Sequence, residues 1–162
     1  MITASYTVSA IPPADLDRIR ARGRDDFDNP VEAIINQDDS GSPLRCCLRD
    51  ATSGERITLI AYRPADRGGP YAEVGPVFIH ADRCDGYSDP AAYPEGFRNR
   101  RQLFRAYDRD GQQVHNRIVE PADVDSAIAE LLDRPDVDVI HSRNVLAGCY
   151  MFAINRVQAG LG

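Results

Sequence analysis

The stretch GPVFIHADRCDGY, which begins at Gly75, contains two residues able to bind a metal or to form a catalytic pair. His80 precedes Cys84 by four positions, and an imidazole with a thiol could hold zinc or act as base and nucleophile. This spacing brings two side chains to one face only in a helix. GPVFIH is rich in β-branched and aromatic residues, which predicts a strand that ends in a loop. We therefore expect His80 to be a site residue and Cys84 not to be its partner.

The stretch from His141 to Asn144 contains further candidate site residues. Alternation in the predicted strand 137–141 places His141 on the same side as Arg143, two residues further on. An arginine can hold a carboxylate or phosphate through two hydrogen bonds, and a neighbouring histidine can move a proton. We assign His141 as acid or base, Arg143 as the anion clamp and Asn144 as an orienting residue, with His80 as a second proton-handling group. The alternative is a core histidine at the end of a strand.

Cys149 is a candidate nucleophile, because it follows Gly148 and opens the last predicted strand. A nucleophilic thiolate needs a histidine or an arginine close by, and a hairpin over residues 141–149 could supply His141. The alternative is a small apolar core residue, since free cysteines are commonly buried. The adjacent Cys46 and Cys47 would point to opposite faces if they lie in a strand.

The composition excludes several classes of function. The 162-residue chain has a formal net charge of −6, and all 19 of its basic residues are arginines. Without lysine there is no Schiff base, no pyridoxal phosphate anchor and no Walker-type phosphate loop. The acidic balance argues against nucleic acid as a partner, and no apolar run reaches the roughly 18 residues of a membrane span. The N-terminus lacks a signal-peptide pattern, so we expect a cytoplasmic protein with free thiols.

Two helices are predicted to support these side chains. The first follows Pro12 and Pro13 and ends at Gly23. The second, over residues 123–134, begins after Pro121 and carries an apolar stripe that should face the core. The stripe consists of Val124, Ile128, Leu131 and Leu132.

The other elements are predicted to be strands. Residues 45–64 predict a hairpin about the turn 52–55, and residues 103–120 predict a second about Asp110 and Gly111. Further strands are expected at 5–11, 77–80, 137–141 and 148–157. We therefore expect one α+β domain over residues 1–162, with a mostly antiparallel sheet or partly open barrel and two helices packed on it.

A long loop over residues 82–100 interrupts this pattern. Loops of this length in compact domains are commonly functional. Its aromatic residues Tyr87, Tyr93 and Phe97 either cover a small ligand or anchor the loop to the sheet.

Several motifs, taken together, resemble those of one bacterial family. They are CLRDA at 47–51 with GE at 54–55, PY at 70–71 with GPVFIH at 75–80, RAYD at 105–108, and HSRN at 141–144 with GCY at 148–150 and Arg156. The chain is similar over about residues 43–156 to the family catalogued as domain of unknown function 1203. The resemblance implies no activity, because that family is uncharacterised. Arg105 and Tyr71, which lie in these motifs, are further candidate substrate-binding residues.

The first motif departs from the family pattern, which often reads Pro-Cys-Arg-x-Cys-Leu. Here Leu44 takes the position of the earlier cysteine, Cys47 matches the later one, and Cys46 is extra. A Cys-x-x-Cys pair for metal or redox chemistry is therefore broken in this chain.

These observations predict a small-molecule enzyme or a binder of anionic ligands, with its site where His80, His141, Arg143 and Asn144 converge under the loop 82–100. The expected partner is a small anionic molecule. No cofactor and no metal ligand is assigned. Two alternatives stay open: a non-catalytic protein-interaction module, and a zinc-binding domain that draws on Cys47, His80, Cys84, His141 and Cys149.

Overall fold

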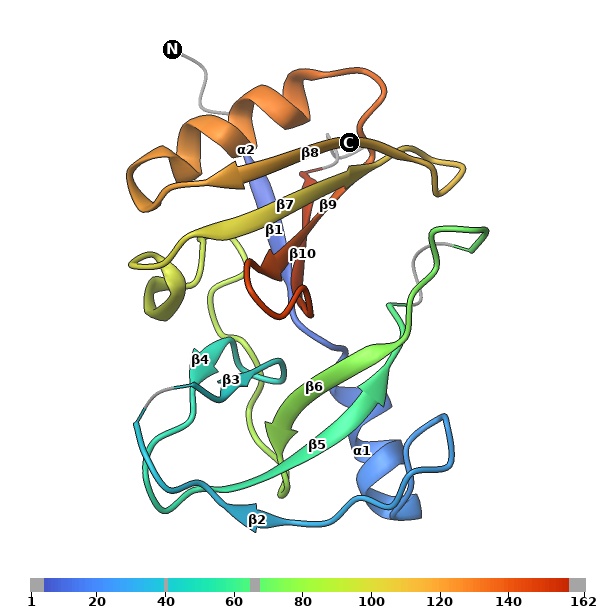
Figure 1. Ribbon diagram of the computed structural model, residues 1–162, viewed down its shortest axis with the longest axis vertical. Coiled ribbons are helices and arrows are strands. Elements are labelled where there is room, and N and C mark those ends of the chain that lie inside the picture. The colour runs from blue at the N-terminus through green and yellow to red at the C-terminus, as the bar shows by residue number, and fades with distance from the viewer. Residues whose placement is uncertain (1–4, 40, 65–67, 158–162) are drawn as a thin grey trace, which may run out of the picture.

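Two five-stranded sheets, one above the other in Figure 1, organise the chain. The coordinates come from a computed structural model and describe residues 5–39, 41–64 and 68–157. All pairings in the first sheet are antiparallel. Its strands, in spatial order, are β1 (Tyr6–Ser9), β10 (Tyr150–Arg156), β9 (Val139–Asn144), β7 (Gln102–Tyr107) and β8 (Gln113–Val119).

The second sheet is antiparallel except for one parallel pairing, in which Leu44 of β3 lies beside Phe78 of β6. This pairing brings the turn after β3 to the end of β6. The strands, in spatial order, are β2 (Ile34–Ile35), β5 (Arg56–Tyr62), β6 (Gly75–His80), β3 (Pro43–Leu44) and β4 (Arg49–Asp50).

Each sheet is covered by one helix, and both helices lie where the sequence predicts them. Helix α1 (Pro13–Arg22) has proline at its first turn and ends at Gly23, whose φ of 72° is the left-handed conformation that suits glycine. Helix α2 (Val124–Asp133) follows a short 3-10 turn, η2 (Pro121–Asp123). Neither helix has the length or apolar character that crossing a bilayer requires, and the described residues contain no other α-helix.

Two main hydrophobic cores follow from this arrangement. In the first, the predicted stripe of α2 packs on the first sheet, and its residues Val124, Ile128, Leu131 and Leu132 are all buried. In the second, Leu16 and Ile19 of α1 pack against the second sheet. Cys46 belongs to this second core, and Cys47 and Cys84 pack against it.

The loop over residues 82–100 carries the chain from the second sheet back to the first. Tyr93 and Phe97 are buried in the first core, and Tyr87 packs against it. Phe97 ends the 3-10 turn η1 (Glu95–Phe97) and stacks on Phe152 of β10. The aromatic residues therefore anchor the loop to the sheet, as one of the two sequence interpretations proposed.

The α+β class and the mostly antiparallel strands are confirmed, with two sheets in place of the one expected and no closed barrel among the described residues. The hairpin predicted at 103–120 is confirmed as β7 and β8. The hairpin predicted at 45–64 is wrong, because β4 pairs with β3 whereas β5 pairs with β2 and β6. Residues 45–48 form a turn instead, closed by a 3.0 Å hydrogen bond from Leu48 N to Leu44 O.

Candidate functional site

The turn over residues 45–48 directs two adjacent cysteines to the same side. Leu48 has a φ of 59°, and the turn returns the chain from β3 to β4. The sulfurs of Cys46 and Cys47 are consequently 3.9 Å apart. The opposite-face prediction for this pair is wrong, because alternation of side chains applies to a strand and not to a tight turn.

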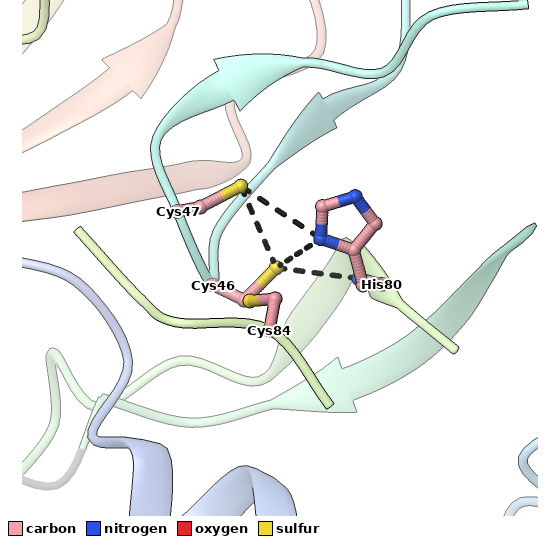
Figure 2. Close-up of side chains that lie close together, drawn as sticks. All are labelled: Cys46, Cys47, His80 and Cys84. Carbon is pink, nitrogen blue, oxygen red and sulfur yellow. Dashed lines mark hydrogen bonds between the residues drawn. The ribbon is translucent and has the colours of Figure 1, made fainter. Parts of the chain in front are cut away.

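His80 and Cys84 complete the cluster (Figure 2). His80 is the last residue of β6, and its Nδ1 lies 3.5 Å from the sulfur of Cys46 and 3.8 Å from that of Cys47. Cys84 comes from the loop that follows, and one ligand atom from each of the four residues lies within 4.8 Å of the others. Three sulfurs and one imidazole nitrogen therefore lie close enough together to be candidate ligands of a single metal ion.

The separations among Cys46, Cys47 and His80 match those around a tetrahedral zinc ion. Zinc binds sulfur at about 2.3 Å and imidazole nitrogen at about 2.0–2.1 Å. At tetrahedral angles these bonds place two sulfurs about 3.8 Å apart, and a sulfur and a nitrogen about 3.5 Å apart. Cys46, Cys47 and His80 differ from these spacings by at most a few tenths of an ångström.

Glu55 fixes the orientation and the tautomer of His80. Its Oε1 lies 3.0 Å from His80 Nε2. Arg49 also approaches Nε2, at 3.3 Å, but arginine can only donate, so the two contacts require opposite tautomers. The shorter contact, to a carboxylate, places the proton on Nε2 and leaves the lone pair of Nδ1 facing the sulfurs. A carboxylate behind a histidine is the usual support of a metal-binding imidazole.

The surrounding groups change the pKa values of the three thiols in different directions. The backbone N–H of His80 donates to the Cys46 sulfur at 3.3 Å. The hydrogen bond from Cys46 to Cys47, with burial, raises the pKa of the Cys46 thiol, and the same bond lowers the pKa of Cys47. Burial raises the pKa of Cys84. The two hydrogen bonds from Arg49 hold the pKa of Glu55 well below its usual range.

Arg143 belongs to a different place, where the two sheets meet. Its side chain is 6% exposed and lines a pocket of about 410 Å³ with Glu73 and Cys149. Arg143 Nη1 lies 2.8 Å from Glu73 Oε2, and Arg105 Nη1 lies 3.1 Å from Glu73 Oε1. The predicted anion clamp therefore already holds one carboxylate, that of Glu73.

The other predicted residues near Arg143 have distinct environments. His141 is buried between the rings of Tyr107 and Tyr150, with centroids 4.8 and 5.0 Å away. It lines a smaller pocket that also includes Tyr71 and Arg143. Asn144 instead caps the turn between β9 and β10, where its Oδ1 accepts hydrogen bonds from the backbone of residues 146 and 147.

The expected convergence of His80 with His141, Arg143 and Asn144 is wrong. The Arg143 pocket includes Gly75, the first residue of β6, whereas His80 is the last. Five residues of extended strand separate these ends by about 16 Å. The strand that the sequence predicts therefore places the two histidines at different sites.

Cys149 lies beside a buried arginine. Arg45 is 1% exposed, and its Nη2 donates to the Cys149 sulfur at 3.0 Å. Its Nε donates to Tyr150 O at 2.8 Å, and its Nη1 donates to Pro43 O. The sequence suggests His141 as the group that a hairpin brings to the Cys149 sulfur. The structure places Arg45 beside this sulfur.

Comparison with known proteins identifies the family of the chain. The model of the family described as Protein of unknown function (DUF1203) matches residues 41–156. The chain belongs to the DUF1203 family. No curated protein and no solved structure matches it.

All four residues of the cluster lie in the DUF1203 region. Sequence reasoning named Cys47, His80 and Cys84 as possible zinc ligands but rejected Cys84 as the partner of His80, and it treated Cys46 as extra. Leu44 stands where the family often has its earlier cysteine. It lies in β3, and its side chain is buried in the second core. Two signals were present in this DUF1203 sequence: the spacing from His80 to Cys84 is in the range that metal sites use, and the adjacent cysteines Cys46 and Cys47 precede it.

Proposed function

We propose that this protein is a zinc-binding domain, with Cys46, Cys47, His80 and Cys84 as the ligands. The observation that carries the proposal is the set of separations among Cys46, Cys47 and His80, which suit a tetrahedral ion, with the Cys84 sulfur within 4.8 Å of all three. Soft thiolates with one imidazole in this geometry favour zinc over magnesium, calcium or manganese.

The number of ligands supports a structural role for the metal. Structural zinc sites have four protein ligands, whereas catalytic sites keep one position open for water or substrate. Cys46 is buried, and the other three residues are partly buried. The ion would join the turn after β3, the end of β6 and the beginning of the long loop.

Charged side chains surround the cluster. Three thiolates and one neutral imidazole around Zn²⁺ carry a net charge of −1. Arg20 donates two hydrogen bonds to the carbonyl of His80, and Arg49 lies beside the imidazole. The guanidinium of Arg49 is paired with the carboxylate of Glu55, and that of Arg20 places a positive charge beside the cluster.

The test is the metal content of the purified protein and of single cysteine variants. We expect one zinc per chain in the native protein, and loss of most of it in Cys46→Ser, Cys47→Ser and Cys84→Ser. Cys149→Ser is the matched control, because its sulfur contacts Arg45 and lies outside the cluster. It should retain the zinc.

Cobalt substitution gives a second readout that does not depend on yield. The thiolate-to-cobalt absorption of a tetrahedral site grows with the number of thiolates. It should be the same in the native protein and Cys149→Ser, and weaker in Cys84→Ser. A protein that binds neither zinc nor cobalt, or a Cys84→Ser variant that behaves like Cys149→Ser, would overturn the proposal.

A further inference from the structure

The three cysteines of the proposed zinc centre differ in their access to solvent. Cys46 is 1% exposed, whereas Cys47 and Cys84 are partly exposed. We propose that the cluster is a redox switch, in which a peroxide joins Cys47 to Cys84 in a disulfide and the zinc is released. This inference rests on the proposed zinc centre and adds a covalent modification that regulates it.

The sulfurs lie close enough together for a disulfide to form with a small movement of the chain. The Cys84 sulfur lies within 4.8 Å of those of Cys46 and Cys47 (Figure 2). Cys84 belongs to the stretch 83–87, which has no regular secondary structure. A segment outside the hydrogen-bond ladders of helices and sheets moves at a lower free-energy cost than a paired strand. Cys84 is therefore the cysteine that can move toward the other two.

The two adjacent cysteines are poorly placed to bond with each other, although their sulfurs are 3.9 Å apart. Consecutive α-carbons are about 3.8 Å apart across a trans peptide, whereas disulfides usually need about 4.4–6.8 Å between α-carbons. A disulfide between Cys46 and Cys47 would therefore strain the backbone of the turn. It follows that a disulfide within the cluster contains Cys84.

Solvent access selects Cys47 as the partner of Cys84. A peroxide has to contact a sulfur to oxidise it, and the susceptibility of cysteines to oxidation follows their exposure. The Cys46 side chain is packed in the second core, and its sulfur accepts a hydrogen bond from the backbone N–H of His80. We therefore expect Cys46 to stay reduced.

The reaction is balanced with hydrogen peroxide as the oxidant. The thiolate of one exposed cysteine attacks a peroxide oxygen, the O–O bond breaks, and a sulfenic acid and a hydroxide ion form. The second thiolate attacks the sulfenic sulfur, the S–S bond forms, and a second hydroxide leaves. The two sulfurs together lose two electrons, which the peroxide takes up. Both hydroxides collect protons from the solvent.

The disulfide removes two of the four metal ligands. Cys46 and His80 remain, whereas a structural zinc site has four protein ligands. The ion is therefore released, and the new bond from Cys47 to Cys84 takes its place as the link between the turn after β3 and the beginning of the long loop. A dithiol reductant reverses the bond by thiol–disulfide exchange.

The first test adds hydrogen peroxide to the zinc-loaded native protein and follows zinc release with a chromophoric chelator. We expect release of one zinc per chain, and its rebinding after dithiothreitol and zinc are added. Non-reducing peptide maps should show Cys47 linked to Cys84, with the alkyl label for free thiols on Cys46. Cys149→Ser is the matched control and should behave like the native protein, because its sulfur lies outside the cluster.

The second test uses metal-free protein, prepared with a strong chelator, so that disulfide formation is measured without zinc. Peroxide should form the same disulfide in the native protein and in Cys46→Ser. It should form no disulfide within the chain in Cys84→Ser. The native protein gives the readout on its own if a variant fails to fold. A disulfide between Cys46 and Cys84, or overoxidation without a disulfide, would overturn the proposed pairing.

The two tests separate this inference from the zinc proposal. A native protein that takes up no zinc would overturn the zinc centre and, with it, the release of metal. A zinc-loaded protein that keeps both its zinc and its thiols in peroxide would overturn the switch and leave the zinc centre intact.

Discussion

At the scale of single residues, the most informative contact is that between Glu55 and His80. The carboxylate accepts a hydrogen bond from Nε2 at 3.0 Å, and it is itself held by Arg49 at 2.6 and 2.9 Å. An imidazole fixed from behind presents its Nδ1 lone pair to the sulfurs without loss of rotational freedom on binding. Glu55 is therefore a positioning residue for the proposed metal.

Replacing this carboxylate tests the positioning role. We expect Glu55→Gln to lower zinc affinity by about tenfold to a hundredfold, because the weaker acceptor no longer fixes the imidazole. Competition with a chromophoric chelator measures the affinity. Glu73→Gln is the control, since Glu73 also pairs with arginines but lies at the other pocket. Equal affinities of the two variants would contradict the role of Glu55.

At the scale of elements, Asp25 fastens the segment after α1 to β5. The side chain is fully buried. It accepts backbone hydrogen bonds from Phe27 at 2.9 Å, Asn29 at 3.0 Å and Ala61 at 2.8 Å. Burial alone would raise the pKa of Asp25, but these bonds outweigh it and lower the pKa. One carboxylate thus accepts hydrogen bonds from the loop after α1 and from β5, and supplements the single bridge between Arg24 and Pro30.

Removing Asp25 should cost stability in a pH-dependent way. We expect Asp25→Ala to lower the free energy of unfolding at pH 7 by about 3 kcal/mol, because buried N–H groups lose their acceptor. A lowered folded pKa means that the contribution is complete above the unfolded value of about 3.9 and is lost as the pH falls below it. The difference between native protein and variant should therefore narrow in acid.

Urea denaturation at neutral and acidic pH measures this effect. Asp125→Ala is the control: its carboxylate is 68% exposed and pairs with Arg98 at the surface, so the change should stay within about 0.5 kcal/mol. A difference for Asp25→Ala that is the same at both pH values would contradict the pKa argument.

At the scale of the whole molecule, the proposed zinc centre lies where the chain leaves the second sheet for the first (Figure 1). Cys84 begins the loop whose later residues, Tyr93 and Phe97, are buried in the first core. Bound zinc would therefore fix one end of this connection, while the aromatic side chains fix the other.

Removing the metal should destabilise the connection between the two sheets before it affects the first sheet and α2. We expect a strong chelator to lower the unfolding temperature, since a ligand at about a thousand times its Kd stabilises the folded state by about 4 kcal/mol. Amide hydrogen exchange should accelerate first in residues 81–92 and leave α2 protected. Chelator-independent exchange in that segment would contradict the structural role.

The sequence by itself determined the elements whose signals are local. Prolines and Gly23 bounded α1, the apolar stripe defined α2, and an Asp-Gly turn marked the β7–β8 hairpin. The absence of lysine excluded several chemistries without any structure. Each of these signals acts over a few residues and needs no distant partner.

Only the tertiary structure decided which chemical groups meet. Cys46 and His80 are 34 positions apart, and they meet because β3 pairs in parallel with β6, a contact that no local periodicity encodes. The tight turn that directs both cysteines to one side directly follows β3, whose pairing with β6 cannot be seen in the sequence. Local patterns therefore predict a strand over these residues. Arg45 reaches Cys149 across 104 positions for a related reason, since burial between two sheets selects its partner. Long-range packing, and not spacing along the chain, therefore sets both candidate sites.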